Sequence, residues 1–135
     1  MSAITVTAAQ VAVIDPLKSI IKSYIAYETI TAGAAVYIDP TTGKCGLAED
    51  ASSFLQFRGI ALNGGGAGQA IDVLEDGEVY GFTLAGNYDA LVYASGSVAG
   101  GLDTAGSVVC GRIVPMANAE RTKVLRVFVL RTAQI

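Results

Sequence analysis

A chain of 135 residues fits one domain and is long enough to bury a core without disulfides or a structural metal. Hydrophobic residues make up 52% of it and charged residues only 16%, below the roughly 25% of a typical soluble domain. Because so little charge is available to cover the surface, we expect other subunits to cover part of it. The nine basic residues are scattered and the net charge is −3, which argues against a nucleic-acid partner.

The apolar residues occur in short runs, none of which approaches the roughly 20 residues of a membrane-spanning helix. We therefore expect no membrane contact. The first residues also lack the basic-then-apolar order of a secretory signal, so we expect the protein to be made and used in a cytoplasm.

The first segment, 2–13, is rich in Thr, Ala and Val and contains neither glycine nor charge, which predicts an extended arm. Asp15-Pro16 follows, and these residue types favour the start of a helix. The apolar spacing from Leu17 to Tyr24 fits either one or two helical turns or an edge strand. We place the boundary after Ser23, which gives an arm of residues 1–23 and a β domain of residues 24–135.

Short β-prone runs separated by turn residues follow in the first half of the β domain. A strong turn is predicted at 39–43, where Pro40 presets φ and Gly43 accepts a positive φ. A short helix is predicted at 48–57 and a glycine-rich loop at 63–69. The predicted strands of this half are 24–27, 35–38, 44–47 and 59–62.

In the second half, strands 71–74 and 78–84 are predicted to form a hairpin around the turn 75–77. A strand at 90–93 and a polar loop at 95–106 come next. The remaining predicted strands are 107–114, ended by Pro115, and 123–131. The last strand is apolar on both faces, so it is either central or covered by a partner.

Together these elements predict a mainly β fold: a small single-domain β-barrel or sandwich with an extended N-terminal arm and one short helix.

The residues needed for catalysis or metal binding are scarce. The absence of histidine removes the commonest general base and most zinc sites. Cys45 and Cys110 are too few for a cysteine-only zinc site, and we favour free thiols over a disulfide. The glycine-rich stretch 64–68 leads into an apparent strand rather than a helix, unlike a phosphate-binding loop.

The acidic residues around 72–78 indicate a solvated turn better than a calcium site, because the spacing of a calcium-binding loop is absent. We therefore predict that the protein is not an enzyme, and we assign no catalytic, cofactor-binding or metal-binding residue.

Several short segments, in this order, resemble small capsid decoration proteins of tailed bacteriophages, also called cement or head-fibre proteins. The likeness covers roughly Tyr24 to Val129. The segments are 30–39, Gly43, 47–48, 58–61, 67–69 leading into 71–73, and 110–114. The resemblance implies a β-rich, usually trimeric domain on the exterior of the virion capsid, made in the cytoplasm of a bacterial host. There it would stabilise the shell by bridging neighbouring major capsid protein subunits.

Two contact sets follow from this hypothesis. An uncharged β-prone arm can add a strand to an open sheet edge of the major capsid protein, although it can also be a flexible terminus in the free chain. The expected capsid-binding residues of the arm are Ile4, Val6, Val11 and Val13. The expected oligomer interface lies on the last strand, at Arg126, Val127 and Val129.

Two alternatives stay open. The first is a phage fibre or tail-tube component, which would polymerise alone. The second is a carbohydrate-binding β module, suggested by the tyrosines and the glycine-rich loops.

Overall fold

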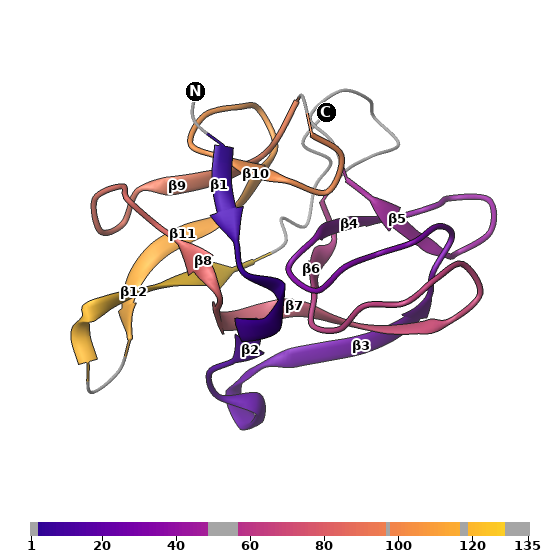
Figure 1. Ribbon diagram of the computed structural model, residues 1–135, viewed down its shortest axis with the longest axis horizontal. Coiled ribbons are helices and arrows are strands. Elements are labelled where there is room, and N and C mark those ends of the chain that lie inside the picture. Colours follow the sequence, from indigo (N-terminus) through magenta and orange to yellow (C-terminus); the bar gives the residue numbers. More distant parts are fainter. Residues whose placement is uncertain (1–2, 49–56, 97, 117–118, 129–135) are drawn as a thin grey trace.

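The protein folds into a mainly β domain, as predicted, in a computed structural model that describes residues 3–48, 57–96, 98–116 and 119–128 (Figure 1). Its strands form one curled antiparallel sheet that closes about half of a barrel. Within the described residues the strand order is β5-β4-β6-β7-β12-β11-β9-β10-β1-β8, and β2 and β3 also pair with β7. The strands in this path are β1 (Ala3–Val6), β4 (Ala35–Ile38), β5 (Cys45–Leu47), β6 (Gly59–Ala61), β7 (Ala70–Tyr80), β8 (Phe82–Thr83), β9 (Leu91–Ala94), β10 (Leu102–Asp103), β11 (Val109–Met116) and β12 (Ala119–Val127).

The long strand β7 organises the sheet. Its first half pairs with β3 (Ile20–Ile25) and β6, and its second half pairs with β12 and β2 (Ala12–Val13). The predicted hairpin at 75–77 is therefore wrong, because the chain continues through this segment as one strand. Gly77 has a φ of +147°, and a Cβ there would meet Oγ of Ser19 at 2.5 Å. The glycine thus permits a bend and a close approach rather than a turn.

The core is divided into two clusters that lie on opposite faces of β7. Leu74 and Val79 belong to the larger cluster, and Ile71 and Val73 belong to the smaller one. Consecutive β7 residues are buried because the curled sheet covers both faces of the strand. β12 is likewise central: it pairs with β7 and β11, which explains why its sequence is apolar on both faces.

Two sequence predictions in the second half need correction. Pro115 does not end its strand but lies within β11, opposite Lys123. Its ring nitrogen is tolerated there because β9 pairs only with the earlier part of β11 and leaves that edge open. The loop predicted at 95–106 contains the short strand β10, which links β9 to β1.

The N-terminal part contains two single turns of 3-10 helix, η1 (Ala8–Gln10) and η2 (Pro16–Lys18). Asp15 caps η2, since its Oδ1 accepts a hydrogen bond from the Leu17 amide at 3.2 Å. The helix does not continue to Tyr24. From Ile20 onward the alternative prediction of an edge strand is correct. Most of the short helix predicted at 48–57 lies outside the described residues.

Candidate interaction surface

The predicted arm lies against the domain that it precedes. β1 pairs with β10 through Ala3 and Ile4, and with β8 through Thr5 and Val6. Each of these pairings comprises two residues, and β2 adds a third short pairing, with β7. The outer side of residues 5–10 is exposed throughout, and no charged side chain occurs between residues 2 and 14. This segment, which we call the arm face (residues 3–13), is an uncharged part of the surface.

Of the four arm residues expected to bind a capsid, three pack against the chain's own core. Ile4, Val11 and Val13 are half-buried on the larger cluster. Val6 is 39% exposed, and one of its methyl groups lies over Gly33. In this fold only Val6 presents its side chain to solvent, and the other three hold the arm face to the domain.

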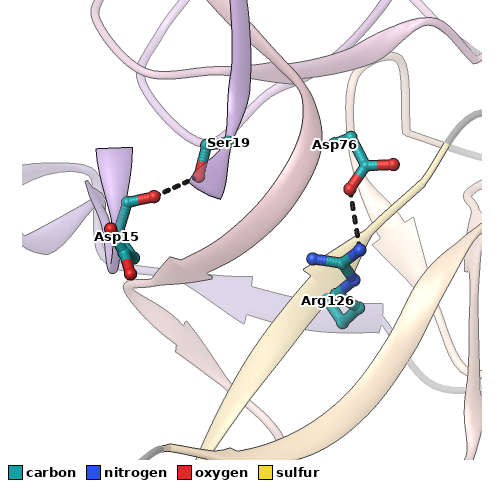
Figure 2. A network of polar contacts seen from close by, with 4 residues as sticks. All are labelled: Asp15, Ser19, Asp76 and Arg126. Carbon is teal, nitrogen blue, oxygen red and sulfur yellow. Dashed lines mark hydrogen bonds and ion pairs between the residues drawn. The ribbon is translucent and has the colours of Figure 1, made fainter. Parts of the chain in front are cut away.

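The predicted oligomer residues on β12 are not gathered into one exposed patch. Val127 is fully buried in the core, so its side chain is not at a surface, and Val129 lies outside the described residues. Arg126 is half-exposed and donates to Oδ1 of Asp76 at 2.8 Å (Figure 2). Among these residues, only Arg126 has a side chain that the structure places at the surface.

A surface pocket of about 380 Å³ lies beside this ion pair, between β7, β12 and the turn η2. Asp15, Lys18, Glu78 and Arg126 contribute charges of both signs to its wall. On one side Ser19 donates to the Asp15 carbonyl oxygen at 2.6 Å, which fixes the start of β3 (Figure 2). The mixed charge gives the pocket no clear preference for an anion or a cation.

In the described part of the chain, the largest group of exposed apolar side chains runs from η2 along β3, and it was not predicted from the sequence. Leu17 is 97% exposed and Ile20 is 58% exposed, although both are large and apolar. Ile21, Ile25 and Tyr27 continue the group along the strand. We call residues 17–27 the β3 edge. The adjacent residues Ile20 and Ile21, followed by Lys22, could have indicated this exposure from the sequence. Two neighbouring isoleucines in a strand point to opposite faces, so an apolar side chain lies on each face.

Tyr24 and Glu75 form a polar contact on the inner side of the β3 edge. The Tyr24 hydroxyl donates to Oε2 of Glu75, and Nζ of Lys22 lies 5.2 Å from the centre of the Tyr24 ring. Burial, followed by the hydrogen bond and the negative charge of Glu75, raises the pKa of Tyr24 to about 12. Lys22 therefore lies beside an aromatic ring that is itself bonded to a carboxylate.

A second tyrosine cluster surrounds β5. Tyr27 is 52% exposed, and the ring of Tyr37 lies directly on Gly46, where a Cβ would be 2.6 Å from a ring carbon. Burial, Asp39 and Glu28 together raise the pKa of Tyr37. Two aromatic rings and two carboxylates thus share this part of the surface.

The described residues contain no group of three or more acidic or cysteine side chains placed to hold a metal ion. Cys45 and Cys110 are both buried, form no disulfide, and lie in different core clusters. No helix of the described part of the chain combines the length and apolar character needed to cross a membrane.

Comparison with known proteins adds no relative: no family model, curated protein or solved structure matches the chain.

Proposed function

We propose that this chain is a structural protein of a virion that binds the outside of a phage head and stabilises the shell by bridging capsid subunits. The observation that carries the proposal is the arm face, an exposed and uncharged segment held to the domain by short strand pairings. The resemblance of its short segments, in their order, to decoration proteins is a second reason for proposing this role.

The arm face would reach a capsid subunit by apolar contact and by strand addition. The exposed residues of the segment carry no charge that binding would have to desolvate. Each contact is small, but many copies on one shell add their effects through multivalency. Since Ile4, Val11 and Val13 pack on the core, the outer surface of the segment would make this contact.

Substitution tests the proposal better than deletion, because removing the segment would uncover the larger core cluster. Ala9 lies in η1, which contains no buried residue, so Ala9→Glu places a charge on the arm face without disturbing the core. Ala67→Glu makes the same change of charge at an exposed position in a distant loop.

The experiment is co-sedimentation with expanded heads that lack the protein. We expect the wild-type chain and the Ala67→Glu variant to sediment with the heads, and Ala9→Glu to bind at least about 10-fold more weakly. Equal binding by the two variants would remove the arm face from the mechanism. No sedimentation of the wild-type chain would reject the function itself.

The tyrosine cluster around β5 favours carbohydrate binding as a second candidate function. Exposed aromatic rings stack on sugar rings, and carboxylates accept hydrogen bonds from sugar hydroxyls. A glycan array would report binding that Tyr27→Ala abolishes and that Tyr80→Ala, at another exposed tyrosine, leaves intact. An array without hits would reject this candidate.

A further inference from the structure

The β3 edge has open backbone hydrogen-bonding groups as well as exposed apolar side chains. Ala26 donates to the Gln69 carbonyl oxygen at 2.8 Å and accepts from Gly68 at 2.9 Å, so its backbone groups point toward β7. Because these directions alternate along a strand, the groups of Lys22 and Tyr24 also point toward β7. Those of Ile21 and Ser23 point outward, where the described residues supply no further strand.

The open stretch has a defined end. Tyr27 donates its amide to the Cys45 carbonyl oxygen at 2.7 Å, and Ala26 forms a bridge with Cys45. β5 therefore occupies the same edge just beyond Ile25. An added strand has access only to the residues before this point.

We propose that a second copy of this chain pairs with the β3 edge, antiparallel and about a two-fold axis through Ser23. The sequence Ile21-Lys22-Ser23-Tyr24-Ile25 is complementary to itself in this register. Ile21 of one copy lies opposite Ile25 of the other, and Lys22 lies opposite Tyr24. The same patch thus serves both partners, as a two-fold interface requires.

The charges select the partner and the register. Lys22 of one copy meets the Tyr24 ring and the Glu75 carboxylate of the other, which are already hydrogen-bonded to each other. A register centred on Lys22 would oppose two like charges. A register centred on Tyr24 would place Tyr27, whose amide is already bonded to β5, in the interface. The register centred on Ser23 avoids both conflicts.

The apolar side chains support the same pairing. Ile21 and Ile25 are 39% and 44% exposed, and they lie on the same face of β3. Pairing about Ser23 brings the two residues of both copies into one row. That row removes apolar surface from water, which favours association.

A disulfide across the axis tests the register directly. In a hydrogen-bonded antiparallel pair the Cα atoms are about 5.5 Å apart, within the roughly 4.4–6.8 Å range of disulfides. Ser23→Cys is therefore expected to form a disulfide-linked dimer under mild oxidation. Ile21→Cys is the matched control, because the register keeps the two copies of residue 21 far apart. Native Cys45 and Cys110 are buried and do not compete.

A second pair of variants tests the backbone contact. Ser23→Pro removes an amide that points away from β7, so the domain is expected to stay folded, as circular dichroism would check. Ser23→Ala is the control, because both variants lose the bond between the Ser23 hydroxyl and Asp72 but only proline lacks the amide. We expect Ser23→Pro to raise the dissociation constant roughly 10-fold or more relative to Ser23→Ala.

Light scattering of the wild-type chain completes the test. We expect a mass of twice the 13.8 kDa of one chain. Six chains would also agree, because this two-fold contact can combine with a three-fold one. A monomer or a simple trimer would overturn the inference, as would cross-linking of Ser23→Cys no faster than that of Ile21→Cys. Head binding is measured separately, so either proposal can fail while the other stands.

Discussion

The protonation state of the Tyr24 hydroxyl makes the stability of the fold depend on pH. Its folded-state pKa of about 12 lies above the ordinary value of 10.0. The protonated hydroxyl therefore contributes stability that is complete below pH 10 and is lost as the pH rises toward 12. The sequence alone did not indicate this, because Glu75 is distant along the chain.

Tyr24→Phe is expected to remove the latest component of the tyrosinate absorbance titration and to flatten the alkaline loss of stability. Tyr27→Phe, at an exposed ring, is the control and is expected to leave the latest component in place. A latest component that is unchanged in Tyr24→Phe would contradict the assignment.

Val127 distinguishes a core role from an interface role. Its side chain is fully buried in the larger cluster, so Val127→Ala is expected to lower the free energy of unfolding by about 2 kcal/mol. Denaturant unfolding would measure this loss, which is expected not to depend on protein concentration. Val98→Ala, at an exposed valine, is expected to change stability by less than about 0.5 kcal/mol. A loss that grows on dilution would instead place Val127 in an interface.

Among the secondary-structure elements, the sequence predicted the structure correctly where a turn signal and the strand signals on either side of it indicate the same hairpin. The turn at 39–43 is followed by β5, and β4 has the predicted bounds of 35–38. Asp39 supports that turn, because its carboxylate accepts hydrogen bonds from the Thr41 and Thr42 amides. The two strands that flank the turn pair with each other in the predicted order.

Local sequence failed where distant pairing overrides turn chemistry. Asp76-Gly77 is a strong hairpin signal, yet β7 runs through it because β3, β6, β12 and β2 all pair with this strand. The candidate surfaces also depend on pairing between distant strands. The exposure of the β3 edge and the burial of Val127 depend on which strands are neighbours, and the local pattern of each strand left that choice open.

The bend in β7 yields a prediction about its glycine. Gly77→Ala is expected to destabilise the domain by about 1–3 kcal/mol, because a Cβ would meet Ser19 and the backbone would be strained at its positive φ. Gly66→Ala is the control, since the nearest atom to its Cβ is 3.9 Å away. Thermal denaturation of both variants would measure the difference. Equal melting temperatures would show that the bend does not need a glycine.

At the scale of the whole molecule, the two core clusters each enclose one cysteine. Burial raises the pKa of the Cys45 thiol, which keeps it protonated and unreactive at neutral pH. We expect neither thiol to react with a thiol reagent in the native protein and both to react after unfolding. Rapid labelling of one thiol without denaturant would show that its cluster opens locally.

In both proposals the domain acts through its surfaces. The arm face is proposed to meet the capsid and the β3 edge a second copy, and these two surfaces occupy different parts of the sheet (Figure 1). The low charge of the chain and its exposed apolar residues are consistent with two separate contact surfaces. The proposed function claims that the protein stabilises a shell, which requires more than binding to it.

Calorimetry of undecorated expanded heads, with and without saturating wild-type protein, tests that claim most directly. The proposed bridging predicts that the disruption temperature of the heads rises with added protein until the sites are filled. A disruption temperature unchanged at saturating protein would contradict it.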